Sequence, residues 1–173
     1  PSVKVCICDA AGRVKDVQEE IAFVRECAKF ASVVTDGIAD GTIPLRVTHN
    51  DTKINNVLFH PETHKPMVIV DLDTVMPGLS LYDFGDSIRF GANTAAEDER
   101  DLSKVSLDLE LFDVYTKGFL KGCAGGLTET EIMLLPEGAK MMTMECGMRF
   151  LEDYLRGDVY FKTQYAEHNL VRC

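Results

Sequence analysis

The 173-residue sequence predicts a single, mainly helical domain with one or two small β-hairpins. Three observations lead to this prediction. Apolar residues recur every three or four positions from about residue 13 to 40 and again in later segments, as in amphipathic helices. One pair of short apolar runs flanks a turn bounded by prolines, as in a hairpin. The hydrophobic fraction is 46% and the charged fraction 27%, so the chain has an ordinary globular composition rather than a disordered one.

The first candidate element is a short strand at residues 3–8, and a long helix is expected from about residue 13 to 40. Apolar side chains follow this helix at three- and four-residue spacing, while charged residues occupy its other faces. Gly41 is the expected C-cap, and Pro44 forbids continuation of the helix. The periodic apolar residues are Val14, Val17, Ile21, Val24, Ala28, Ala31 and Val34.

The next segment alternates short extended pieces with turns. Residues 45–48 are expected to be extended, and residues 49–55 to form a polar loop. Residues 56–60 and 67–73 are predicted to pair as a hairpin, whose second arm is apolar enough to predict burial. The Pro-Gly dipeptide at residues 77–78 predicts another turn.

The rest of the sequence predicts helices. One is expected at residues 81–91 and another at residues 109–121. Thr128 and Glu131 form a capping-box pattern, which predicts the start of a third helix that is rich in methionine. A Pro and a Gly within residues 136–138 predict an interruption of this last helix.

Charge and cysteine content exclude several classes of partner. The sequence has 18 Lys and Arg against 28 Asp and Glu, a net charge of −10. Nucleic acids and anionic membrane surfaces bind basic footprints, so neither is an expected partner. The longest apolar runs are far shorter than the ~20 residues of a membrane-spanning helix. The six cysteines form no Cys-x-x-Cys pair, and we interpret them as free thiols of a cytoplasmic protein.

Three polar residues have a spacing that suits phosphoryl transfer to a hydroxyl group. That reaction needs a carboxylate that orients the acceptor hydroxyl, together with oxygen ligands that hold Mg²⁺ against the phosphates. Asp51 lies on the polar loop, Asn56 begins the first strand of the hairpin, and Asp71 lies near the end of the second. Because paired antiparallel strands bring these two ends together, Asn56 and Asp71 are expected to lie close to one another.

The pattern His49-x-Asp51-x-x-x-x-Asn56, followed by an apolar strand and Asp71, resembles the catalytic signature of kinase-fold small-molecule phosphotransferases. Aminoglycoside phosphotransferases and choline kinases belong to this family. The resemblance implies the C-terminal lobe of a protein-kinase-like α+β fold, with ATP as co-substrate and Mg²⁺ as cofactor. It also implies that Asp51 is the catalytic base at the acceptor hydroxyl and that Lys53 reaches the transferred phosphate. Asn56 and Asp71 would then bind the metal and the nucleotide, and His49 would brace the loop.

Longer segments narrow this resemblance. Residues 45–53, 70–78 and 81–86 resemble the N-acetylhexosamine 1-kinase branch, and so do later segments that contain Arg149 and Tyr160. The likeness extends from about residue 13 to the C-terminus. It implies transfer of a phosphoryl group to the anomeric hydroxyl of an N-acetylhexosamine, with Arg149 and Tyr160 as sugar contacts.

Several side chains have two interpretations. Asp73 is either a second metal ligand or a solvated strand end. Asp83 precedes a helix and is interpreted as its N-cap rather than as a ligand. Arg149 and Tyr160 either contact the sugar, or Arg149 pairs with a nearby carboxylate and Tyr160 packs against the fold.

The sequence contains no G-x-G-x-x-G motif and no strand-rich region ahead of the first long helix. The resemblance implies that a nucleotide-clamping N-terminal lobe precedes this region, so residues 1–173 are expected to be the C-terminal lobe alone, inactive without that partner. The expected activity is that of an ATP-dependent kinase for an N-acetylhexosamine. The alternatives are a kinase for another small alcohol, such as choline or an aminoglycoside, and a non-catalytic lobe that binds a sugar or a partner.

Overall fold

The computed structural model describes residues 9–173, so the candidate strand at residues 3–8 lies outside the described residues. Within them the chain is mainly helical with two small antiparallel strand pairs, as the sequence predicts. The helices are α1 (Gln18–Asp40), α2 (Ser80–Gly91), α3 (Leu109–Gly122), α4 (Glu129–Arg156) and α5 (His168–Arg172). The strands are β1 (Arg46–Thr48), β2 (Val57–Phe59), β3 (Pro66–Ile69) and β4 (Met76–Gly78).

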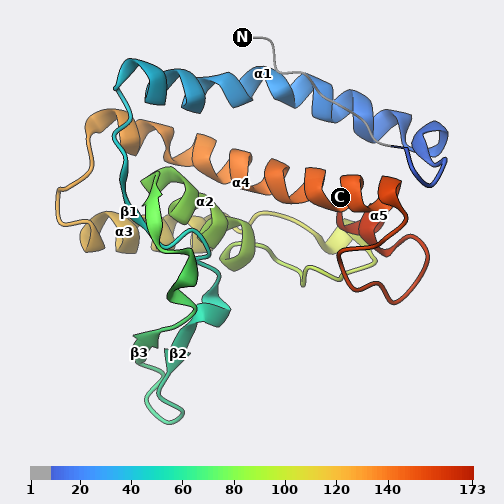
Figure 1. The fold of residues 1–173 in the computed structure, drawn as a ribbon. Helices are drawn as coiled ribbons and strands as arrows, with labels where there is room; N and C mark the ends of the chain where they lie inside the picture. Colours follow the sequence, from blue (N-terminus) through green and yellow to red (C-terminus); the bar gives the residue numbers. More distant parts are fainter. Residues whose placement is uncertain (1–8) are drawn as a thin grey trace.

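The helices form one body from which the β2–β3 hairpin extends (Figure 1). In this body α1 lies alongside α4, and the N-terminal half of α1 packs on the C-terminal half of α4. A second core forms around Phe84 of α2, which is fully buried and contacts the rings of Phe112 and Phe119 of α3. Because Phe84 lies next to Asp83 in the sequence, this core holds the start of α2 in place.

The predicted C-cap of α1 is confirmed, and the structure adds an N-cap for α3. Gly41 terminates α1 with φ of 78°, a left-handed conformation that glycine adopts without a Cβ clash. Asp108 caps α3, because its Oδ1 accepts the backbone N–H groups of Glu110 and Leu111 at 2.9 and 3.0 Å.

Helix α4 runs without a break from Glu129 to Arg156, so the predicted interruption at residues 136–138 is wrong. The capping box of Thr128 and Glu131 is confirmed. Pro136 removes one backbone donor, but dense packing of α4 against α2 keeps the helix continuous. Tertiary contacts therefore override the local preference of proline.

Two glycines allow α2 and α4 to cross at very short distance. A Cβ atom on Gly85 of α2 would overlap the backbone carbonyl of Gly138, and one on Gly138 would overlap the carbonyl of Leu81. Gly138 is therefore required by the crossing of the two helices rather than by a turn.

The predicted hairpin is confirmed, since β2 and β3 pair antiparallel with Val57 opposite Ile69. Its second arm is not buried, because Met67 is 66% exposed and β3 has no layer packed on it among the described residues. The predicted turn at residues 77–78 is also wrong. These residues belong to β4, which pairs with β1 so that Arg46 lies opposite Gly78.

A buried ion pair joins β1 to α4. Arg46 donates from Nε and Nη2 to the two carboxylate oxygens of Glu131, each at 2.6 Å. Glu131 is fully buried and also accepts hydrogen bonds from Ser80 Oγ and the backbone N–H of Thr128. The Arg46 hydrogen bonds outweigh burial and lower the pKa of Glu131 to about 2. One carboxylate thus connects β1, the start of α2 and the start of α4.

Two further sequence predictions concern cysteine pairing and membrane insertion. The four cysteines of the described region, Cys27, Cys123, Cys146 and Cys173, are free thiols, as predicted. None of the helices within residues 9–173 is both long and apolar enough to cross a membrane.

Candidate active site

The polar loop at residues 49–56 connects β1 to β2 and is held on helix α2 by Asp83. The two carboxylate oxygens of Asp83 accept the backbone N–H groups of His49 and Asn50 at 2.8 and 2.7 Å. Thr52 Oγ1 donates to the carbonyl of Asp83 at 2.6 Å, and Ser87 Oγ donates to the carbonyl of Thr52. The loop backbone is therefore fixed to a buried helix at three points.

The predicted N-cap role of Asp83 is wrong. Helix α2 begins after Leu79 without a side-chain cap, and Asp83 lies in its first turn. The carboxylate is turned toward the 49–56 loop, whose N–H groups it binds instead of those of its own helix. Local spacing within α2 did not indicate this contact, because the two partners lie more than 30 residues apart in the sequence.

The ring of His49 braces the loop from inside. Its Nδ1 accepts the backbone N–H of Asp51 at 3.3 Å, so the proton lies on Nε2, which donates to the carbonyl of Val70 at 3.2 Å. Thr74 Oγ1 donates to the carbonyl of His49 at 2.7 Å. These contacts hold the loop against the segment that follows β3.

Asp51, Lys53 and Asn56 form one hydrogen-bonded group. Asp51 Oδ2 accepts from Lys53 Nζ and from Asn56 Nδ2, each at 2.9 Å, and Asn56 Nδ2 also donates to the carbonyl of Asp51. Partial burial alone raises the pKa of Asp51, but the hydrogen bonds from Lys53 and Asn56 outweigh it and lower that pKa. Asp51 is therefore ionised at neutral pH. Its Oδ1 accepts no hydrogen bond from the described part of the chain.

The 49–56 loop and the β2–β3 hairpin place Asp71 beside this group. The backbone N–H of Val70 donates to the carbonyl of Asn56 at 2.9 Å, so Asp71 follows directly at the same end of the hairpin. The hydrogen bond that Lys53 donates to Asp51, opposed by burial, raises the pKa of Lys53, and the charges of Asp51, Asp71 and Asp86 add to the increase. The negative charges of these three carboxylates therefore all act on Lys53.

A family model for the phosphotransferase enzyme family (APH) matches residues 8–110, more than half of the chain. The matched span contains the whole 49–56 loop and both Asp71 and Asp83. The chain belongs to the phosphotransferase enzyme family. The general reaction of this family is phosphoryl transfer, and we interpret the geometry of the 49–56 loop in terms of that reaction.

In a phosphotransferase, Asn56 and Asp71 have the donor atoms that Mg²⁺ prefers. Because the Nδ2 group of Asn56 binds Asp51, the carboxamide orientation is settled and Oδ1 is left without a hydrogen bond from the described residues. Asp71 is exposed, with φ of 64°, and its carboxylate binds no donor in the same region. Such hard oxygen ligands fit Mg²⁺, which takes one or two protein oxygens and completes its shell with phosphates and water.

Within residues 9–173 no group of three His, Cys, Asp or Glu side chains is placed to hold a metal ion by itself. A site formed by Asn56 and Asp71 differs from such a group, because one of its ligands is a carboxamide. Asp73 is exposed on the short 3-10 helix Leu72–Thr74, next to the same end of the hairpin.

Arg149 and Tyr160 come together at the C-terminal part of the phosphotransferase. Arg149 Cζ lies 5.8 Å from the centre of the Tyr160 ring, and its Nε is 3.7 Å from Glu145 Oε1. No hydrogen bond or ion pair of the described chain connects either side chain to the 49–56 loop. The contacts agree with the alternative in which Arg149 pairs with a carboxylate, although Tyr160 remains 73% exposed.

A large apolar groove of about 970 Å³ lies elsewhere on the phosphotransferase, between α1, α4 and the start of α3. Phe23, Phe30, Phe112, Met141, Met144 and Met148 are among its lining residues. None of the residues of the 49–56 loop lines this groove. The groove and the loop are therefore separate features.

Proposed function

We propose that this phosphotransferase moves the γ-phosphoryl group of ATP to the anomeric hydroxyl of an N-acetylhexosamine and forms the sugar 1-phosphate. The observation that carries the proposal is the ionised Asp51, whose Oδ2 is held by Lys53 and Asn56 while its Oδ1 accepts no hydrogen bond from residues 9–173. The choice of an N-acetylhexosamine as acceptor is supported by the segments at residues 45–53, 70–78 and 81–86, which resemble that branch.

In the proposed reaction, Asp51 Oδ1 accepts the hydrogen bond of the acceptor hydroxyl. As the acceptor oxygen bonds to the γ-phosphorus and the bond to the ADP oxygen breaks, the hydroxyl proton passes to Asp51. Asn56 and Lys53 fix the orientation of the carboxylate, and Lys53 carries the positive charge nearest to the transferred phosphate. Mg²⁺, held by Asn56 and Asp71 with Asp73 as a further candidate ligand, would neutralise charge on the phosphates.

We also propose that residues 1–173 act as the C-terminal lobe and that a nucleotide-clamping lobe completes the ATP site. The support is electrostatic: Lys53 is surrounded by Asp51, Asp71 and Asp86, so ATP needs further cationic groups. The 173-residue chain should then transfer phosphate at a negligible rate. A turnover near the enzyme median of about 10 s⁻¹ would contradict this part of the proposal.

The acceptor is tested with the full-length protein, ATP and Mg²⁺. N-acetylglucosamine, N-acetylgalactosamine, choline and kanamycin are compared by release of ADP, and the product is identified by ³¹P NMR. A 1-phosphate of an N-acetylhexosamine, with loss of the reducing end, is expected. Faster turnover of choline or kanamycin would contradict the sugar assignment, and absence of turnover with all four would favour a non-catalytic lobe.

The free thiols support a cytoplasmic location for this activity.

A further inference from the structure

Asp86 is a buried carboxylate on α2 that the proposed reaction does not yet use. It is 7% exposed and lies three residues after Asp83 and one before Ser87. Residues three and four apart share one face of a helix. Because Asp83 and Ser87 both bind the 49–56 loop, the same face directs Asp86 toward that loop.

Only one of the two oxygens of Asp86 is engaged. Oδ1 accepts from Arg89 Nε at 3.1 Å and from Arg89 Nη2 at 3.0 Å. Oδ2 accepts no hydrogen bond from the described residues. Among the described residues, only Tyr165 has a side-chain polar atom, Oη, that is both fully buried and without a hydrogen bond. Since Asp86 Oδ2 has no hydrogen bond from them either, it must retain some contact with solvent. An accessible carboxylate oxygen therefore remains beside the 49–56 loop.

The two partners of this ion pair have different neighbours. Arg89 lines the apolar groove between α1 and α4, whereas Asp86 does not. The negative charge of Asp86 contributes to the raised pKa of Lys53, so the carboxylate lies near the 49–56 loop.

We propose that Asp86 is an acceptor-binding residue whose Oδ2 accepts a hydrogen bond from a second hydroxyl of the sugar while Asp51 Oδ1 holds the hydroxyl that attacks. This proposal rests on the proposed phosphotransfer and deepens it, since it names a determinant of acceptor choice. A buried carboxylate that binds a hydroxyl discriminates strongly against an acceptor that lacks this group, because the charge is then left without a donor. It therefore favours polyhydroxylated acceptors over simple alcohols.

The decisive comparison removes the ion pair in both variants of the full-length protein. Arg89→Gln keeps the Asp86 carboxylate, whereas the double variant Asp86→Ala/Arg89→Gln lacks it and leaves no unpaired arginine. The double variant is expected to have a KM for N-acetylglucosamine about 10- to 100-fold above that of Arg89→Gln, with the KM for ATP changed less than twofold. Equal KM values for the sugar in the two variants would overturn the proposal.

A set of 3-deoxy, 4-deoxy and 6-deoxy analogues of N-acetylglucosamine identifies the hydroxyl. One of them should be about tenfold or more poorer for Arg89→Gln but not for the double variant. If no analogue distinguishes the two variants, Asp86 acts only in the fold. If both variants merely lower Tm and kcat together, the Asp86–Arg89 pair is likewise structural.

The outcome is separable from failure of the proposed function. Turnover of N-acetylglucosamine by the unmodified protein tests the function, and the variant comparison tests Asp86. If choline or kanamycin proves to be the acceptor, the same two variants are compared on that acceptor, and equal KM values again overturn the role of Asp86. If no acceptor is phosphorylated, calorimetric titration with N-acetylglucosamine replaces KM, and absent or equal binding overturns it.

Discussion

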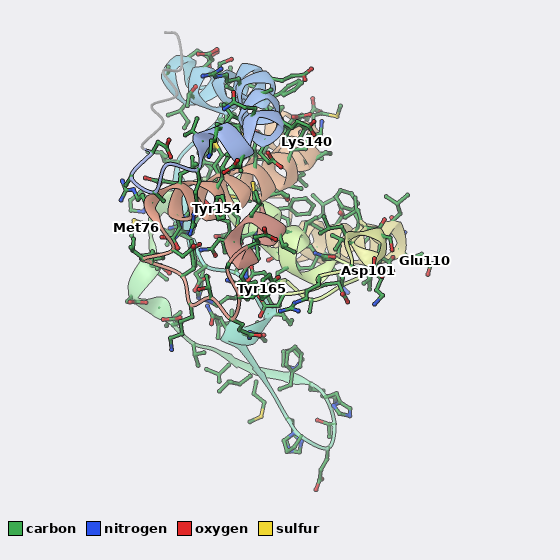
Figure 2. The ribbon with its side chains drawn as sticks, turned by 90° about the vertical axis from the view of Figure 1, so that its right-hand side faces the viewer. Met76, Asp101, Glu110, Lys140, Tyr154 and Tyr165 are labelled. Carbon is green, nitrogen blue, oxygen red and sulfur yellow. The ribbon has the colours of Figure 1, made fainter. Side chains whose placement is uncertain are left out.

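Asp83 accepts the backbone N–H of Asn50 at 2.7 Å across 33 positions of the sequence. Its other oxygen accepts the N–H of His49, so a single side chain on α2 fixes the loop that carries Asp51. The loop is thereby attached to a helix that is itself held in the core, because Phe84, the residue next to Asp83, is fully buried. Figure 2, in which the ribbon is turned by 90°, shows the side chains that fill this helical body and the projecting hairpin beside it.

Asp83→Ala should lower kcat by about 10-fold or more, because two backbone N–H groups lose their acceptor and the loop loses its position. Steady-state kinetics and thermal unfolding are measured together. Asp108→Ala is the matched control, since Asp108 also accepts two backbone N–H groups but at the start of α3. It should cost about 1 kcal/mol of stability and leave kcat unchanged. Equal loss of kcat in both variants would show a general effect on folding.

Asp51→Asn should lower turnover of the full-length protein by about 10²–10⁴-fold, the usual loss for a general base, with little change in ATP affinity. Asp71→Asn should weaken ATP-Mg²⁺ binding as well, because it removes charge from the proposed metal site. Kinase assays and ATP-Mg²⁺ titrations on both variants measure the difference. The base assignment fails if Asp51→Asn keeps more than about a tenth of the rate. Reversed effects on ATP affinity would mean that the two roles have been exchanged.

Glu131 should make stability depend on acid pH. Its folded pKa of about 2 lies below the ordinary 4.5, so its contribution is complete above pH 4.5 and is lost as the pH falls toward 2. Glu131→Gln should destabilise the protein by about 3 kcal/mol at pH 7, the low end for a broken buried pair, because Arg46 is 31% exposed to screening water. Urea unfolding between pH 7 and pH 3 measures the difference in unfolding free energy between the parent and Glu131→Gln. This difference should shrink below pH 4.5.

Glu137→Gln is the control for this measurement. Glu137 pairs with Lys140 at 2.8 Å on the surface of the same helix, where Lys140 is 66% exposed. Such a pair contributes little, so the variant should remain within about 0.5 kcal/mol of the parent at every pH. A constant difference for Glu131→Gln across the whole pH range would be evidence against ionisation as the source of its effect.

Gly138→Ala should destabilise the protein by about 1–3 kcal/mol, because the added methyl group meets the backbone carbonyl of Leu81 where α2 and α4 cross. Gly118→Ala tests the intrinsic effect of the same change within helix α3, where nothing lies within 4 Å of the new Cβ. It should stabilise the protein by about 0.5–1 kcal/mol. Chemical denaturation measures the free energy of unfolding of both variants. If the helices cross as closely as described, this free energy falls for Gly138→Ala and rises for Gly118→Ala.

Helical periodicity predicted α1 and α3 closely, and Gly41 marked the end of α1. The hairpin was also predictable, because Val57 and Ile69 belong to apolar runs around a turn bounded by prolines. The errors concern residues whose conformation depends on distant partners. Pro136 remains inside α4, and residues 77–78 join β4 because β1 offers backbone partners 30 positions earlier.

The sequence by itself determined the family-like pattern of His49, Asp51 and Asn56, because their spacing along one loop is local information. It also determined that Asn56 and Asp71 lie at one end of a hairpin. Only the tertiary structure decided that Asp83 holds this loop and that Asp86 pairs with Arg89 through one oxygen. The physical reason is that helix α2 meets the loop through side chains more than 30 residues away, and local spacing cannot specify which N–H groups a distant carboxylate will bind.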